Sequence, residues 1–271
     1  MVRPYIRGPD QDHEAMSELI LETKGLSKDF KGFTAVDGVD LRVQRGHIHA
    51  LIGPNGAGKT TCFNLLTKFL TPTRGRILFG GVDITDERPA QIARRGVIRS
   101  FQISAVFPNL TVLENVRIGL QRFTGTSYHF WRDLSGLRAL DARVLELLEL
   151  VDLRDMAQLK AGELPYGRKR ALEIATTMAM EPKLMLLDEP TQGMGHEDFD
   201  RVTTLIKRVA EGRTVLMVEH NMKVISRIAD QITVLARGSV LAEGDYATVS
   251  AHPAVLEAYM GSEAAELQGA H

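Results

Sequence analysis

The 271-residue sequence predicts an α/β fold in which a mostly parallel sheet is flanked by helices. Short apolar runs at residues 47–52, 184–187 and 214–218 are typical of strands that are buried on both faces. Between the last two runs, residues 199–209 place apolar side chains along one face of a helix. Strands that alternate with helices favour parallel pairing, because each helix carries the chain back across the sheet.

The other elements are expected from the same periodicities. Strands are predicted at residues 19–23, 39–43, 76–79 and 97–101, and helices at residues 59–69, 141–151, 168–180 and 253–259. Residues 103–163 are helical and loop-rich and interrupt the alternation, which indicates a helical subdomain inserted into a core formed by residues 18–102 and 164–261. Residues 1–17 are polar and lack a period, so we expect a disordered extension, and residues 262–271 are expected to be a flexible tail.

Composition excludes several classes of protein. Lys and Arg number 33 against 34 Asp and Glu, and a net charge of -1 argues against a protein that binds the nucleic-acid backbone. The single cysteine, Cys62, excludes a disulfide scaffold. No apolar run approaches the ~18 residues of a membrane-spanning helix, and residues 1–18 lack the apolar stretch of a secretory signal. We therefore expect a reduced, cytoplasmic protein.

A phosphate-binding loop is the strongest motif in the sequence. Residues 53–60 fit G-x-x-x-x-G-K-[ST] without a mismatch, after a predicted strand and before a predicted helix. Glycines let the backbone N–H groups turn inward around a phosphate, and the helix N-terminus adds roughly half a positive charge. Lys59 is expected to reach the β- and γ-phosphates, and the Thr60 hydroxyl to bind Mg²⁺. The order of the glycines does not fit a Rossmann dinucleotide site.

Polar side chains follow three further predicted strands, where ligands bind in open α/β sheets. Asp188 is placed to hold Mg²⁺, and Glu189 to polarise the water that attacks the γ-phosphate. Gln102 could contact the metal or the water, and His220 could donate to the γ-phosphate. Taken alone, each residue has a structural explanation, such as a helix cap or a surface position. The hypothesis rests on their convergence beside the phosphate loop.

With these residues the chain, over residues 19–261, resembles the ATP-binding subunit of an ATP-binding cassette (ABC) transporter. The resemblance implies a P-loop ATPase core with an antiparallel β subdomain and the inserted helical subdomain. Phe30 then occupies the position of the aromatic that stacks on adenine. The resemblance assigns ATP binding to Gly53, Pro54, Asn55, Gly56, Ala57, Gly58, Lys59, Thr60 and Thr61, and the signature motif, which contacts the opposite subunit's ATP, to Leu164, Pro165, Tyr166, Gly167 and Arg168. It makes Glu189, His220 and Gln102 catalytic, and Thr60, Gln102 and Asp188 metal ligands.

The signature departs from the family's L-S-G-G-Q pattern. Pro165 stands at the serine position and Tyr166 at the first glycine. Proline offers neither a hydroxyl nor a backbone N–H to the phosphate. The backbone amide of Gly167 and the positive N-terminal end of the following helix can still contact the phosphate. We therefore expect the signature to bind ATP through this amide and the helix dipole instead of a serine hydroxyl. Whether Pro165 lowers the activity stays open at this point.

More specifically, the chain resembles the ATPases of branched-chain amino acid importers. The features that carry this resemblance are the tyrosine-containing signature and residues 101–102, 110–115, 170–175, 218–222 and 253–261. Lipopolysaccharide-export ATPases share part of the pattern. The resemblance implies an ATPase, with ATP and Mg²⁺, that powers uptake of branched-chain amino acids or related small solutes from the inner face of the cell membrane. Its implied partners are a second ATPase subunit, identical or a sister chain, a transmembrane permease and, indirectly, a solute-binding protein, with no nucleic acid.

Two other classes of protein are alternatives to a transport ATPase. A soluble ABC ATPase of translation would normally carry two cassettes, and one of DNA repair a long heptad insertion, and the sequence has neither. A soluble ABC ATPase of cluster assembly also remains an alternative, as does an export-type one. A P-loop kinase or small GTPase would lack the signature motif. In such a protein, the positions of Phe30 and His220, which match the stacking aromatic and the histidine of ABC ATPases, would be coincidental.

Overall fold

The computed structural model describes residues 18–100, 106–121, 140–192 and 196–259, and its central sheet is mostly parallel. The strand order is β11–β10–β4–β9–β8–β7, with β4 (Ile48–Ile52), β7 (Val97–Arg99), β8 (Leu184–Asp188), β9 (Thr214–Val218), β10 (Gln231–Ala236) and β11 (Ser239–Gly244). Only the β10–β11 pair is antiparallel. The predicted α/β fold with a mostly parallel sheet is confirmed.

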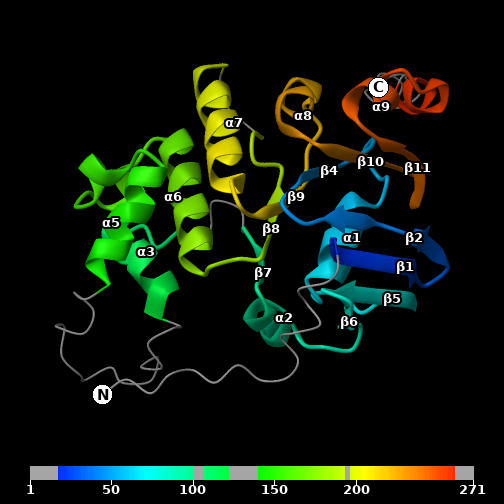
Figure 1. Ribbon diagram of the computed structural model, residues 1–271, viewed down its shortest axis with the longest axis horizontal. Coiled ribbons are helices and arrows are strands. Elements are labelled where there is room, and N and C mark those ends of the chain that lie inside the picture. The colour runs from blue at the N-terminus through cyan, green and yellow to red at the C-terminus, as the bar shows by residue number, and fades with distance from the viewer. Residues whose placement is uncertain (1–17, 101–105, 122–139, 193–195, 260–271) are drawn as a thin grey trace.

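A second, antiparallel sheet lies beside the central one (Figure 1). It consists of β1 (Leu19–Phe30), β2 (Phe33–Val39), β3 (Arg42–Gln44), β5 (Arg74–Phe79) and β6 (Val82–Asp83). Both β2 and β3 pair with β1, on the side of β1 that does not pair with β5. This sheet is the antiparallel β subdomain that the resemblance implied.

The single strand predicted at residues 39–43 was wrong, because the chain changes from β2 to β3 within it. The Thr23 hydroxyl donates to the Val39 carbonyl at 2.8 Å and accepts from the Leu41 amide at 2.8 Å. The Asp40 carboxylate accepts the Gly25 amide at 2.6 Å. Side chains therefore satisfy the backbone at the point where the ladder is interrupted.

Helices cover both faces of the central sheet (Figure 1). One face carries α3 (Val112–Gln121), α5 (Asp141–Leu150), α6 (Tyr166–Ala179), α7 (His196–Ala210) and α8 (Met222–Ile228), and the other carries α1 (Lys59–Leu66) and α2 (Pro89–Arg95). The short helix α9 (Tyr246–Ser250) and a helical stretch at residues 253–259 follow β11. Helix α1 lies between the two sheets, because its buried side chains pack with residues of both.

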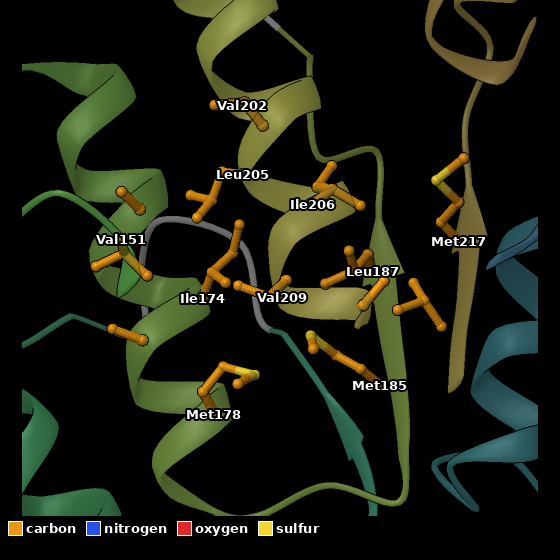
Figure 2. Packing of buried hydrophobic residues seen from close by; sticks show 14 of the residues in the cluster. Val151, Ile174, Met178, Met185, Leu187, Val202, Leu205, Ile206, Val209 and Met217 are labelled. Atoms are coloured by element: carbon orange, nitrogen blue, oxygen red, sulfur yellow. The ribbon is translucent and has the colours of Figure 1, made fainter. Parts of the chain in front are cut away.

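Successive side chains along each central strand point to opposite faces of the sheet, so the hydrophobic core consists of two clusters, one on each face. In β8, Met185 and Leu187 face the cluster formed with α6 and α7, as Figure 2 shows. Leu184 and Leu186 face the opposite cluster, which holds α1 and the antiparallel sheet. The central strands are therefore buried on both faces, as their apolar runs predicted.

The described part of the expected insertion is helical. It contains α3, α5 and short 3-10 turns at Arg154–Met156 and Ala161–Glu163, and α3 and α5 pack against α6. The boundaries of the subdomain stay a prediction, and the expected extension at residues 1–17 and tail at residues 262–271 lie outside the described residues. Within the described ranges, no helix is long and apolar enough to cross a membrane.

Candidate functional site

The predicted phosphate loop joins the buried strand β4 to the first turn of α1. It runs through Gly53, Pro54, Asn55, Gly56, Ala57 and Gly58, and continues into Lys59, Thr60 and Thr61. A Cβ at Gly53 would lie 2.1 Å from the Leu235 carbonyl oxygen, and one at Gly58 would lie 2.5 Å from that of Ala35. Both glycines also have positive φ, 146° and 99°. Close neighbouring backbone and left-handed conformation together require glycine at both positions.

The Lys59 side chain folds back over this loop. Its Nζ donates to the carbonyl oxygens of Gly53 at 2.6 Å and Pro54 at 2.9 Å. Burial lowers the pKa of the Lys59 ammonium, and the carboxylates of Glu189 and Asp188 oppose that shift. The ammonium is thus held at the loop by acceptors that phosphate oxygens can replace. Thr60, next in the helix, is exposed.

Strand register brings the other predicted residues to the same edge. Val218, the last residue of β9, pairs with Leu51 of β4 on one side and with Asp188 of β8 on the other. Asp188 and Glu189 thus lie at the end of β8, and His220 lies just after β9. Strand β9 is adjacent to β4, which ends in the phosphate loop, and β8 is the next strand in the sheet. The structure brings these residues together as the sequence predicted. Gln102 lies outside the described residues.

Glu189 adopts a strained backbone conformation, with a φ of 43°. A non-glycine residue in the left-handed region is destabilised by about 1–3 kcal/mol, and such strain clusters at functional sites. The Glu189 amide donates to the Val218 carbonyl at 2.9 Å, which holds the residue against the end of β9. Its side chain is half-buried, whereas His220 is exposed at the same edge.

Asp188 has a partner that the sequence did not predict. Its carboxylate forms an ion pair with Arg99, and both side chains are largely buried, at 13% and 14% exposure. Arg99 also donates to the Asn64 side-chain oxygen at 2.6 Å and lies over the Phe63 ring. This arginine therefore ties the end of β7 to both α1 and β8. No pattern in the sequence marks Arg99 as the partner of Asp188.

The signature residues form the start of α6, which packs on the face of the central sheet opposite to α1. Leu164 and Gly167 are buried, Pro165 and Tyr166 are exposed, and the Arg168 guanidinium donates to the Asp152 carbonyl at 2.5 Å. Helix α6 begins at Tyr166, two residues earlier than predicted, with Pro165 as its N-cap. Because α6 and α1 cover opposite faces of the central sheet (Figure 1), the chain's own signature is separated from its own phosphate loop.

Phe30 ends β1, and the residue is 41% exposed. The Lys28 ammonium lies 5.2 Å from the centre of that ring. An exposed aromatic face of this kind can stack on a planar base.

Two family models match the chain. One, described as ABC transporter, matches residues 36–192, and the other, described as branched-chain amino acid ATP-binding cassette transporter, matches residues 239–265. The high-affinity branched-chain amino acid transport ATP-binding protein BraF of Pseudomonas aeruginosa is 39% identical, over 91% of this chain and 99% of the relative. LivG of Escherichia coli, which carries the same description, is 38% identical over 91% of this chain and 99% of its own length.

Solved structures agree with the sequence relatives. A crystal structure of the ADP conformation of an ATP-binding cassette of an ABC transporter matches with a TM-score of 0.80 and 30% identity, over 90% of this chain and all of that chain. A dimeric post-hydrolysis cassette bound to ADP and Pi matches with a TM-score of 0.70 and 25% identity, over 83% of this chain and 98% of that chain. Given this phosphate loop, this fold and relatives along nearly its whole length, the chain belongs to the ABC transporter family and is an ATP-binding cassette that hydrolyses ATP.

Proposed function

We propose that this ATPase powers the import of branched-chain amino acids or related small solutes. The observation that carries the proposal is the pair of relatives named for branched-chain amino acid transport, each matching nine-tenths of the chain, together with the match at residues 239–265. The chain acts from the inner face of the membrane on a transmembrane permease, to which a solute-binding protein delivers the cargo. Exposed apolar side chains at Phe107 and Ile118 of the helical insertion support a protein-docking role there.

ATP is held by the segment between β4 and α1. Backbone N–H groups of the loop and the N-terminus of α1 surround the phosphates, and Lys59 leaves its carbonyl partners to bind the β- and γ-phosphates. Phe30 stacks on the adenine.

The donor set at this edge fits Mg²⁺. The Thr60 hydroxyl and the Asp188 carboxylate are oxygen ligands, and Mg²⁺ in nucleotide sites is usually held by one or two carboxylates together with the phosphates. Arg99 occupies one oxygen of Asp188 and so fixes the orientation of the carboxylate. When bound, Mg²⁺ would neutralise charge on the β- and γ-phosphate oxygens.

Hydrolysis is assigned to Glu189 and His220. The Glu189 carboxylate accepts a proton from water as the water oxygen attacks the γ-phosphorus, and the bond from that phosphorus to the ADP oxygen breaks. The exposed His220 imidazole contacts the γ-phosphate and stabilises its charge. Gln102 contacts the metal or the attacking water and links the site to the insertion.

The site is completed by a second subunit. Because α6 and α1 cover opposite faces of the central sheet, one chain supplies the phosphate loop and the other the signature, in a head-to-tail pair around two ATP molecules. Pro165, Tyr166 and Gly167 then present the N-terminus of α6 to the partner's γ-phosphate. The dimeric relative bound to ADP and Pi supports this arrangement.

Uptake by cells tests the proposal. In cells lacking the gene for this chain, we expect the wild-type chain to restore accumulation of radiolabelled leucine, and the Lys59→Ala variant to fail. Parallel assays with urea, amides and aromatic acids define the cargo. Full leucine uptake in cells lacking the gene and its sister ATPases, or restoration only of another solute, would overturn the amino acid assignment.

A further inference from the structure

Glu219 is a buried carboxylate between the loops that carry Glu189 and His220. It follows the last residue of β9 and has no exposed surface. A buried carboxylate is strongly destabilising unless its oxygens accept hydrogen bonds. Glu219 therefore needs partners, and they come from two separate segments of the chain.

Each carboxylate oxygen of Glu219 accepts hydrogen bonds from one of these two segments. Oε1 accepts the Thr191 amide at 3.0 Å and also the Thr191 hydroxyl. Oε2 accepts the amides of His220 at 2.9 Å and Asn221 at 3.1 Å. All of these partners are N–H or O–H donors, so the geometry requires an acceptor at both positions, which an ionised carboxylate supplies.

Thr191 belongs to the turn that begins at Glu189. The Gln192 amide donates to the Glu189 carbonyl at 3.1 Å and closes this turn. The Gln192 carbonyl in turn accepts the Tyr166 hydroxyl at 3.0 Å. A continuous hydrogen-bonded path thus runs from the signature helix, through the turn of Glu189, to the backbone of His220.

We propose that Glu219 is a positioning residue, which fixes the turn of Glu189 and the loop of His220 relative to each other. The inference rests on the roles assigned to Glu189 and His220 under the proposed function. Glu219 is fully buried, and its oxygens bind the backbone of the two loops that carry the assigned groups, so we expect its effect on the chemical step and not on the affinity for ATP. Tyr166 extends the same connection to the segment that serves the partner's nucleotide.

The Glu219→Gln variant separates positioning from simple packing. Glutamine keeps the size and one acceptor but places an NH₂ group against donors on one side, so the two loops lose their common anchor. We expect turnover per bound nucleotide to fall about tenfold, within the hundredfold that a misplacement of about 1 Å can cause. ATP affinity, measured by calorimetry, is expected to stay unchanged.

Asp230→Asn is the matched control. The Asp230 carboxylate also accepts a backbone amide, that of Ile48 at 2.8 Å, but at the start of β4 and thus at the opposite edge of the sheet. The Asp230→Asn variant therefore shows what the loss of a hydrogen-bonded carboxylate away from the site does to the protein. Its turnover per bound nucleotide is expected to match that of the wild type. Thr191→Val, which removes one hydroxyl donor and keeps the backbone amide, is expected to lower turnover in the same direction as Glu219→Gln.

Full turnover per bound nucleotide in Glu219→Gln, or an equal loss in Asp230→Asn, would overturn the inference. If Glu219→Gln does not fold, Thr191→Val decides the question in the same way. Glu189→Gln is measured alongside. If its turnover is normal, the assigned chemistry fails; if its turnover falls while that of Glu219→Gln does not, only the positioning role fails.

Discussion

Replacing Glu189 by glutamine is expected to lower ATP turnover about 10²–10⁴-fold, the range for loss of a general acid or base. The amide cannot accept the proton of the attacking water. Binding of ATP is expected to persist, because Lys59 and the loop amides that hold the phosphates are untouched. Steady-state hydrolysis and a separate nucleotide titration measure the two effects independently.

Glu211→Gln serves as the control for this prediction. Glu211 is exposed after α7, just before the start of β9 and so at the edge of the sheet away from the phosphate loop. The same chemical change there is expected to leave turnover at the wild-type level. A Glu189→Gln variant that hydrolyses ATP within threefold of wild type, a loss of less than about 1 kcal/mol in barrier height, would remove Glu189 from the role of base.

The second large effect is expected from Lys59→Ala, which should weaken ATP binding. A hydrogen bond to a charged group contributes about 1.5–3 kcal/mol, so the dissociation constant is expected to rise roughly 10–150-fold. The Gly53 and Pro54 carbonyls that lose the ammonium lie in a loop whose tip is exposed, where water can replace it. Calorimetric titration with ATP measures the change.

Lys68→Ala is a close match for this substitution. Lys68 follows the same helix and is also 8% exposed, and burial lowers the pKa of its ammonium as it does for Lys59. Its Nζ donates to the Thr85 carbonyl, away from the phosphate loop. ATP affinity is expected to be unchanged in Lys68→Ala. An equal loss of ATP affinity in both variants, or no loss of ATP affinity in Lys59→Ala, would contradict direct phosphate binding by Lys59.

The sequence predicted those parts of the fold and site whose signals are local. The phosphate loop is one contiguous segment, and Asp188, Glu189 and His220 lie at or just after the ends of buried apolar strands. Because these strands are parallel, their carboxyl ends share one edge of the sheet, which brings the residues together. The hairpin of β10 and β11 was missed although its signal is also local. Arg237 and Gly238, both at positive φ, form the two-residue turn between the strands.

Other features depend on contacts between distant residues. Arg99 meets Asp188 across 89 positions, and Glu219 meets Thr191 across 28. No periodicity or motif connects such pairs, because they become neighbours only when parallel strands align. The interruption between β2 and β3 is similar, since it depends on the Thr23 hydroxyl of another strand.

Under the proposed function, a complete ATP site needs the signature of a second chain. Light scattering on Glu189→Gln, during size-exclusion chromatography with and without Mg-ATP, tests this requirement, because the variant is expected to bind ATP and to hydrolyse it very slowly. We expect the mass of one chain without nucleotide and the mass of two chains with Mg-ATP, and of one chain again with ADP. A single-chain mass at saturating Mg-ATP, with bound ATP confirmed by quantification, would contradict closure of this chain with a second copy of itself.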